Sequence, residues 1–367
     1  QSRQRFLAPA LGPLIYNASI IAGGVALAPR LHIAAFAWGA LAGAVVGNVV
    51  LQYAVLRRLG LCYRPALALD HPGVRRVGGM MGAVTLSLAL PQILVELNRA
   101  FGYGVSAGVA SALTNTNRLM QAPLAMFGQA LAVALLPTLS MHASRRDLAC
   151  FRHTLSRSVR FVLFVTLPVS AMMMALSTPL VRMVFEHGQF SAADTALAAP
   201  ILAAYCAAVP AWSVQAVVAR ACFAMGDNRT PVWAGFAVLV LFLVLSLVLR
   251  SALGGPGLAL ATSFCGVVIS LLMARVLSRH VGGLGGTNIL ASLVKTIAAS
   301  VPAAVGAALV GHALAGTAPT QPWLRGLYQC VAGGALGAGL FLGLAALLRV
   351  SEVEDVWRGV RARLRRG

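Results

Sequence analysis

The chain of 367 residues has few charged residues and very few acidic ones. Asp, Glu, Lys and Arg together make up 10% of the sequence, and only 9 residues are Asp or Glu. Soluble domains carry about 25% charged residues, and disordered chains are poor in apolar residues. Because 59% of the residues are hydrophobic and the mean hydropathy is +0.83, the composition excludes soluble enzymes and disordered proteins. It predicts a membrane protein.

Motifs for metal binding or covalent chemistry are also scarce. The 6 cysteines occur without a C-x-x-C pair, and the 7 histidines show neither H-x-x-x-H nor H-E-x-x-H spacing. Of the carboxylates, only Glu96 lies well inside an apolar run. Since an enzyme needs converging acids, nucleophiles or metal ligands, we predict that the protein is not an enzyme. We expect no metal and no other cofactor, and we expect the cysteines to be buried structural thiols.

Apolar runs of about twenty residues or more are abundant, and each is long enough to cross roughly 30 Å of hydrocarbon as a helix. They predict an all-α integral membrane protein with about ten transmembrane helices, and an even number places both chain ends on one side. The runs lie at residues 8–29, 33–56, 77–100, 106–139, 159–185, 192–225, 231–250, 256–278, 288–313 and 326–348.

The net charge of +20 follows the gaps between these runs. Of the 29 Lys and Arg residues, four (Arg30, Arg99, Arg250, Arg325) fall at one set of alternate gaps and three (Arg118, Arg182, Arg220) lie inside runs; the remaining 22 fall on the other side. This bias predicts that both ends are cytoplasmic. Because the charge reports topology, we expect no nucleic acid as a partner. We expect membrane lipids as partners, with the tail 351–367 as an amphipathic helix on the cytoplasmic leaflet.

Two neighbouring spans carry a polar stripe on one helical face. Arg118 lies about twelve residues into its run, near mid-membrane, where a charge costs roughly 2.5–3.5 kcal/mol. At 100° per residue it shares a face with small and polar residues. The stripe of the fourth run consists of Ser111, Asn115, Arg118, Ala122, Ala125 and Gln129, and that of the third run consists of Thr85, Ala89, Gln92, Glu96 and Arg99.

These stripes allow two interpretations. In one, Glu96 pairs with Arg118 or Arg99 and joins two helices. In the other, the stripes line a water-filled, positively charged cavity for an anionic substrate, because an arginine fork fits phosphate or carboxylate. The candidate site residues are Arg118, Asn115, Ser111, Gln92, Glu96 and Arg99.

Turn and proline signals divide the spans. Ser191 and Asp194 predict a capping box that opens the sixth span, and Thr230 with Pro231 predicts an N-cap followed by proline at the first position of the seventh. Prolines inside spans predict kinks. They are Pro91, Pro123, Pro137, Pro200 and Pro210.

Five segments resemble, in order, the MurJ (MviN) family of lipid II flippases, within the multidrug/oligosaccharidyl-lipid/polysaccharide exporter superfamily. The resemblance covers most of the chain, and its segments lie at residues 5–17, 111–128 with 136–140, 185–195, 219–231 and 257–263. Their order implies that the chain begins at the family's fifth helix. The sequence would then be N-terminally truncated, with its ten helices corresponding to helices 5–14 of a fourteen-helix, two-lobe flippase fold.

The resemblance implies a division of the chain into five parts. Residues 1–57 would be a two-helix remnant of the N-terminal lobe, and 58–76 a cytoplasmic linker. Residues 77–280 would be the six-helix C-terminal lobe, 288–350 a final helix pair that forms a lipid groove, and 351–367 the cytoplasmic amphipathic tail.

The resemblance also implies an activity. In the family, the arginine of the segment that matches residues 111–128 lines the central cavity and is needed for flipping. Arg118 occupies that position. The implied protein moves lipid II, the undecaprenyl-pyrophosphate-linked peptidoglycan precursor, across the bacterial cytoplasmic (inner) membrane by alternating access. Its partners would be lipid II and other cell-wall synthesis proteins. The alternatives are another lipid-linked oligosaccharide or drug exporter of the superfamily, and a non-transporting membrane scaffold for cell-wall synthesis.

The sequence departs from the family pattern where some members bind sodium. Asn98 precedes Arg99 where the family often has aspartate, and the run from 233 to 250 contains no acidic or amide residue. Hard cations need several oxygen ligands, preferably anionic ones. We therefore do not expect sodium coupling, and the membrane potential or a proton gradient would be the alternative energy source.

Overall fold

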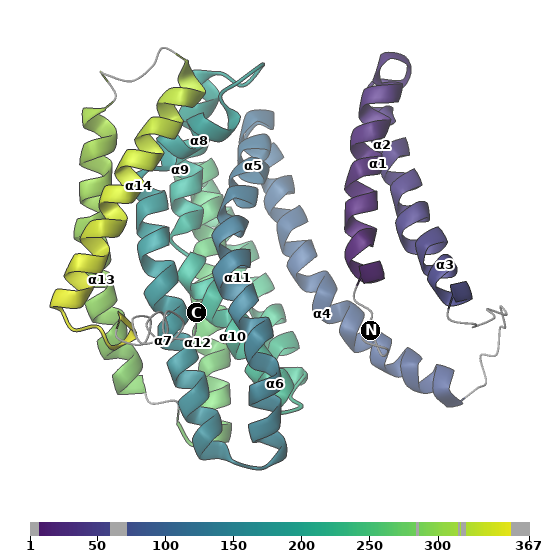
Figure 1. Cartoon of the computed structure of the whole chain (residues 1–367), viewed down its shortest axis with the longest axis vertical. Coiled ribbons are helices and arrows are strands. Elements are labelled where there is room, and N and C mark those ends of the chain that lie inside the picture. Colours follow the sequence, from purple (N-terminus) through teal and green to yellow (C-terminus); the bar gives the residue numbers. More distant parts are fainter. Residues whose placement is uncertain (1–6, 59–71, 284–285, 315, 317–320, 354–367) are drawn as a thin grey trace, which may run out of the picture. The chain divides into compact units, whose positions relative to one another are not determined.

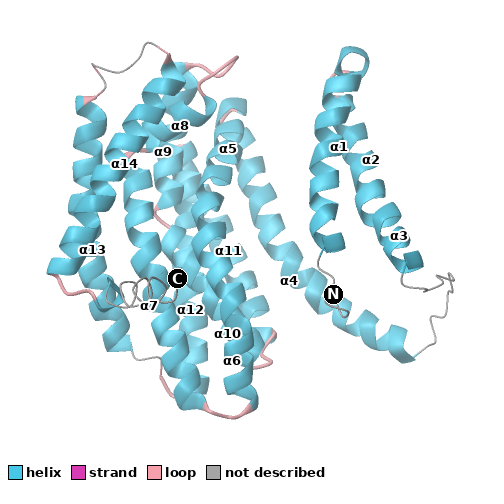
Figure 2. Ribbon diagram, viewed as in Figure 1, coloured by secondary structure: helices cyan, strands magenta, loops and turns pink. Residues whose placement is uncertain are grey.

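The computed structural model describes residues 7–58, 72–283, 286–314, 316 and 321–353, which form helices joined by short turns (Figure 2). No strand occurs among the described residues. The predicted all-α class is therefore confirmed. Close contacts between Cα atoms divide the chain into two compact units, Gln1–Gly79 and Met80–Gly367.

The first unit is a pair of packed helical segments. It contains α1 (Leu7–Leu31), α2 (Ala34–Ala44), the π-helical segment η1 (Val45–Val50) and α3 (Leu51–Arg58). The helices α1 and α2 lie side by side (Figure 1). Their approach requires small residues, because a Cβ atom at Gly39 would lie 2.6 Å from the carbonyl oxygen of Ser19. Such close backbone packing is typical of helix pairs in membranes.

The second unit is a bundle of long helices. It holds most of α4 (Pro72–Tyr103), followed by α5 (Ala107–Pro123), η2 (Leu124–Gln129), α6 (Ala130–Ser144), α7 (Leu148–Ala175), α8 (Ser177–Phe185), α9 (Ala192–Cys206), α10 (Val209–Ala224), α11 (Arg229–Leu253), α12 (Gly255–Val281), α13 (Gly286–Ala313) and α14 (Pro322–Leu347). One apolar core gathers α6, α7, α10, α11 and α12 around Phe242 and Met273. Another joins α5, α9 and α12 around Tyr205 and Leu258.

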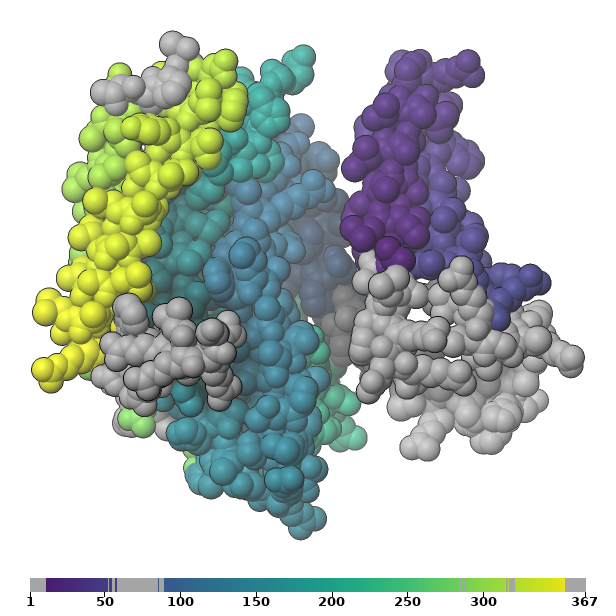
Figure 3. Space-filling model, viewed as in Figure 1, coloured from purple at the N-terminus to yellow at the C-terminus, as the bar shows by residue number. Residues whose placement is uncertain are grey.

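The last two helices pack on each other and on α7 and α8. Helix α14 runs as a band across the surface of the unit (yellow in Figure 3). It approaches its neighbours through glycine, since a Cβ at Gly326 would lie 2.6 Å from the backbone of α8. At the other end, Phe341 packs on Phe164 of α7 with ring centroids 5.3 Å apart.

Helices occupy all ten predicted apolar runs. Seven described segments are long and apolar enough to cross a membrane, and the bent pair α9–α10 makes an eighth if it counts as one span, with a bend of 42°. The two remaining runs, 33–56 and 77–100, hold α2–η1–α3 and α4. The fold is thus that of a multi-pass membrane protein.

Several details differ from the sequence predictions. Helix α4 already begins at Pro72, inside the predicted linker, whose residues 59–71 lie outside the described part of the chain. The predicted run 159–185 holds two helices instead of one, because a break at Leu176 separates α7 from α8. Helix α7 also starts earlier than the run, at Leu148. Most of the predicted tail, 354–367, also lies outside the described residues.

The turn predictions were partly right. Ser191 and Asp194 form the expected capping box at α9. Thr230 does not cap α11, because that helix begins one residue earlier and Asp227 Oδ1 accepts the backbone N–H groups of Arg229 at 3.1 Å and Thr230 at 3.0 Å. Two prolines stand at irregularities, Pro123 directly before the π-helical η2 and Pro210 at the start of α10.

Candidate functional site

Helix α5 buries one face and leaves the opposite face open. The hydroxyl of Ser106 caps the helix by accepting the N–H of Val109 at 3.2 Å. Leu113 and Met120 are buried in the core, whereas Arg118 lies on the exposed face of the second unit. This amphipathic pattern leaves the polar stripe of α5 on the open face of the second unit.

A cavity of about 140 Å³ lies beside Arg118, between α4 and α5, and we call it the arginine pocket. In the part of the chain that the structure describes, two arginines and no carboxylate line it, so its charge is positive. Its polar lining includes Asn98, Arg99, Asn117, Arg118, Tyr205 and Thr262.

The two arginines of this pocket differ in their partners. Arg99 is neutralised by Glu96, one turn earlier on α4, with Nη1 at 3.3 Å from Oε2, and its Nε donates to Thr114 Oγ1 at 3.4 Å. Within the described residues, no ion pair or hydrogen bond joins Arg118 to another side chain. The interpretation in which Glu96 serves as the counter-ion of Arg118 is therefore not supported, and Arg118 leaves one uncompensated positive charge in the pocket.

The floor of the arginine pocket is a fixed polar junction. Asn98 is buried, and its Nδ2 donates to Tyr205 Oη at 3.0 Å and to Thr262 Oγ1 at 2.7 Å. These bonds connect α4, α9 and α12. Sequence reasoning missed Tyr205 and Thr262 as site residues, although hydroxyl groups inside long apolar runs were a usable signal because buried hydroxyls need partners.

The remaining predicted residues do not share this pocket. Ser111 and Asn115 line a second cavity of about 600 Å³ nearer the N-terminus of α5. Gln92 and Glu96 are exposed on α4 and line neither cavity. The six predicted residues thus occupy three places rather than one, and sequence reasoning missed Gln189 of the second cavity.

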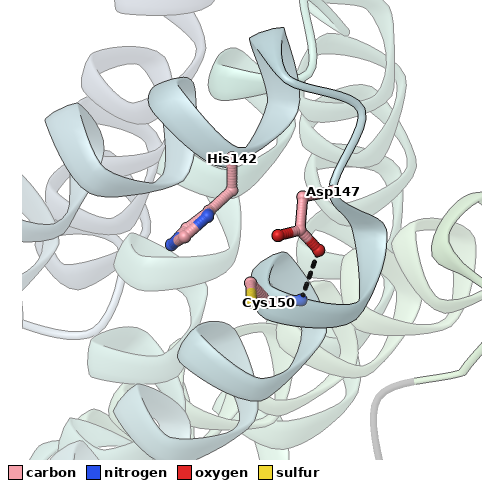
Figure 4. Close-up of side chains that lie close together, drawn as sticks. All are labelled: His142, Asp147 and Cys150. Carbon is pink, nitrogen blue, oxygen red and sulfur yellow. Dashed lines mark hydrogen bonds between the residues drawn. The ribbon is translucent and has the colours of Figure 1, made fainter.

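Three further side chains with ligand chemistry meet where α6 turns into α7 (Figure 4). Ligand atoms of His142, Asp147 and Cys150 all lie within 4.8 Å of one another, a proximity that their sequence spacing did not suggest. Asp147 Oδ1 accepts the N–H of Cys150 at 3.0 Å, and this bond lowers the pKa of Asp147 below its ordinary value. Through this bond the carboxylate acts as the N-cap of α7.

Long apolar helices surround a polar pocket that contains Arg118. The amides and hydroxyls of this pocket can bind a ligand, and its guanidinium group gives it positive charge. The fold and the site together are those of a multi-pass membrane protein with a polar, positively charged pocket.

Comparison with known proteins identifies the family. The family model described as lipid II flippase MurJ matches residues 1–323. The chain therefore belongs to the MurJ lipid II flippase family, whose members are multi-pass proteins of the inner membrane.

Individual relatives agree with this assignment. A probable lipid II flippase MurJ of Rhizobium meliloti is 33% identical over 290 residues, covering 75% of this chain and 52% of the relative. A lipid II flippase MurJ of Burkholderia cenocepacia is 29% identical, covering 73% of this chain and 53% of the relative. The chain thus spans about half the length of these relatives.

A solved structure shows the same fold. It is a lipid II flippase MurJ in an inward closed conformation, with a TM-score of 0.73 and 22% identity, and the match covers 94% of this chain and 68% of the other.

Proposed function

We propose that the protein takes part in moving lipid II across the inner membrane by alternating access, without making or breaking a bond. One observation carries the proposal. Among the described residues, Arg118 has no counter-ion, and its pocket is lined by amides, hydroxyls and Arg99 but by no carboxylate. A guanidinium in such surroundings suits a pyrophosphate or a carboxylate, which it binds with two parallel hydrogen bonds.

The neighbours of Arg118 support this role. Asn117 accepts a hydrogen bond from Gln121 Nε2 at 2.6 Å, which orients both amides at the pocket. Arg99 already forms an ion pair with Glu96. The phosphate contact therefore falls to Arg118, while Glu96 and Gln92 shape the exposed surface of α4 nearby.

The test replaces Arg118 in the complete reading frame. Arg118→Lys keeps the charge but loses the planar fork, so we expect it to abolish most of the flipping, and Arg118→Gln to abolish nearly all. Because Glu96 pairs with Arg99, the double variant Arg118→Gln with Glu96→Gln should stay inactive. The measurement is the amount of lipid II accessible in the outer leaflet, at matched membrane abundance. An active double variant would show that Arg118 only balances a buried charge. Full activity of Arg118→Lys would show that flipping needs no bidentate contact.

We also propose that α13 and α14 bind the polyprenyl tail of the substrate. Both helices expose long apolar side chains, among them Val294, Val301 and Leu309 on α13 and Leu336 and Leu340 on α14. Side chains of this kind match a hydrocarbon chain that lies along the helices. Under this proposal the polar head stays at α5 while the tail remains among lipids.

The residues at the family's sodium region do not fit a sodium ion. Two of the available oxygens, Tyr205 Oη and Thr262 Oγ1, already accept hydrogen bonds from Asn98, and the described lining of the pocket contains no carboxylate. The remaining amide oxygen, Asn98 Oδ1, is neutral, whereas a hard cation prefers several oxygen ligands, some of them anionic. We propose that transport by this protein does not depend on sodium.

The orientation proposed for the chain places both ends in the cytoplasm. The support is the unequal distribution of Lys and Arg between alternate turns. The turn between α6 and α7, with Arg145 and Arg146, would then face the cytoplasm. The turn between α8 and α9 would face the opposite side.

A further inference from the structure

The second cavity of α5, which we call the α5–α9 cavity, lies between α5 and the turn that joins α8 to α9. Its volume is about 600 Å³, and it is lined by Ser111, Asn115, His187, Gln189 and Asp194, together with Phe185 and Phe190. Pockets of about 300–1,000 Å³ are the usual size for groups of small-molecule dimensions. The proposed phosphate contact does not use this cavity.

The wall of the α5–α9 cavity is held by specific bonds. Glu186 Oε2 accepts Arg182 Nε at 3.3 Å and Thr195 Oγ1 at 2.7 Å, which ties the turn to both helices. Gly188 has φ of +64°, the left-handed conformation that the sharp turn requires. Asp194 Oδ2 accepts the N–H of Ser191 at 2.8 Å. The cavity is therefore built by the fold and does not depend on a loose loop.

The lining combines hydrogen-bonding groups with an aromatic surface. Within the described residues, the side chains of Ser111, Asn115 and Gln189 make no hydrogen bond, so their donors and acceptors are free. Phe185 and Phe190 pack with ring centroids 5.8 Å apart and present apolar faces. None of the described residues that line the cavity is Lys or Arg.

This chemistry selects for neutral, hydroxylated rings. Among the described residues that line it, Asp194 is a carboxylate and none is Lys or Arg, so the lining favours a neutral group over an anion. Amides both donate and accept, as sugar hydroxyl and acetamido groups require. An aromatic ring can cover the apolar C–H face of a sugar.

The two cavities open along the same helix. Arg118 follows Ser111 by seven residues, about 10 Å along the axis at 1.5 Å per residue. Asn115 lies between them, one turn from Arg118. A head group in which sugars follow a phosphate can therefore reach both places at once.

We propose that the α5–α9 cavity is a sugar subsite, which binds the neutral sugar rings of a lipid-linked substrate whose phosphate lies at Arg118. The inference rests on the proposed function and specifies how its substrate is recognised. Phe190 covers the face of a ring, and Asn115 and Gln189 hydrogen-bond to its hydroxyl and acetamido groups.

The test compares two ligands on the purified protein, produced from the complete reading frame and placed in nanodiscs. One ligand is lipid II and the other is undecaprenyl pyrophosphate, which has no sugars. The variants are Asn115→Leu and Gln189→Ala. The second lies in an exposed turn, so its effect cannot come from an unfolded helix. Gln129→Leu, on the exposed face of the same span but outside both cavities, is the matched control.

We expect Asn115→Leu and Gln189→Ala to weaken lipid II binding by about 3- to 10-fold, as for the loss of one or two hydrogen bonds. Binding of undecaprenyl pyrophosphate should stay unchanged, and the control should change neither. Unchanged lipid II affinity, or an equal loss for both ligands, would overturn the sugar subsite. Arg118→Gln should weaken both ligands, and if it weakened neither, the phosphate contact of the proposed function would fail while the result for Gln189→Ala still decided the subsite.

Discussion

At the scale of single residues, the junction at Asn98 shows how one amide changes the chemistry of a buried site. Its Nδ2 group donates to two hydroxyl groups, one on α9 and one on α12. Its buried Oδ1 has no hydrogen-bond partner among the described residues. An aspartate here would supply anionic oxygen and no donor. With asparagine at this position, the junction between the three helices is neutral and hydrogen-bonded.

Sodium dependence is the first prediction at this scale. Replacing sodium by potassium in the medium should leave flipping by the complete protein unchanged, because the oxygens near Asn98 are neutral and partly occupied by its amide. Lipid II exposure in the outer leaflet is the measurement. Asn98→Leu should reduce stability, since buried partners lose a hydrogen bond at about 1–3 kcal/mol each. Flipping that required sodium, and lost that requirement in Asn98→Leu at normal abundance, would contradict the prediction.

A second prediction concerns the Asp147 cap. Asp147→Ala should lower the thermal stability of the protein at neutral pH, because the N–H of Cys150 loses its acceptor at the start of α7. The hydrogen bond lowers the pKa of the folded-state carboxyl. The advantage of wild type over the alanine variant should therefore be complete above the ordinary carboxyl pKa of about 3.9 and vanish as the pH falls through the lowered folded value.

The control for this cap is Asp147→Ser, which caps without a titrating group. Its stability relative to the alanine variant should not vary with pH over the same range. Thermal unfolding in detergent between neutral and acidic pH gives both comparisons. A pH-independent difference between wild type and Asp147→Ala would mean that the carboxylate charge does not contribute.

At the scale of helices, the packing of α14 yields a prediction with opposite signs at two glycines. In Gly326→Ala the new Cβ would lie 2.6 Å from Met183 N and Pro179 O, backbone atoms that cannot rotate away. We expect a loss of about 1–3 kcal/mol, as for overpacked sites. In Gly334→Ala the Cβ meets nothing within 4 Å. That variant should be neutral or stabilised by about 0.5–1 kcal/mol through helix propensity. Equal unfolding temperatures for the two variants would refute this packing of α14 on α8.

Most helices could be predicted from the sequence because a span must satisfy its backbone internally and stay apolar, and both demands are visible in composition. The local breaks were harder. The break at Leu176 carries no proline or glycine at the break itself, and Asp227 caps α11 from outside the expected position. Both depend on which neighbours are in contact, and tertiary packing decides that.

The candidate site was predictable in the same partial way. The depth of Arg118 and the 100° period placed it on the open face of α5, where the structure also has it. The period could not show that the stripe divides between two cavities, because the α8–α9 turn that closes the second cavity comes about seventy residues later in the chain. The partner of Glu96 was likewise left open by the sequence and depends on the rotamers of α4.

At the scale of the whole molecule, the distribution of Lys and Arg predicts the orientation in the membrane. An arginine at a turn that stays in the cytoplasm adds no free-energy cost to membrane insertion. Each arginine that crosses the membrane must be desolvated. Only four arginines lie near the helix ends assigned to the outer side, namely Arg30, Arg99, Arg250 and Arg325. The same assignment puts the α5–α9 cavity on the outer side of the arginine pocket, so a substrate that leaves outward would move its sugars ahead of its phosphate.

The orientation is tested with alkaline phosphatase fusions, since this enzyme is active only outside the cytoplasm. Fusions after Gly367 and within the α6–α7 turn at Arg146 should be inactive, and a fusion at Gly188 in the α8–α9 turn should be active. The two turns lie at opposite ends of α7 and α8, so together they report one crossing of the membrane. A cytoplasmic reporter such as β-galactosidase at the same positions should give the reverse activities. Active phosphatase at Arg146 with inactive phosphatase at Gly188 would show the opposite orientation. The sugar subsite would then lie on the cytoplasmic side, where it could act only when the substrate enters the protein.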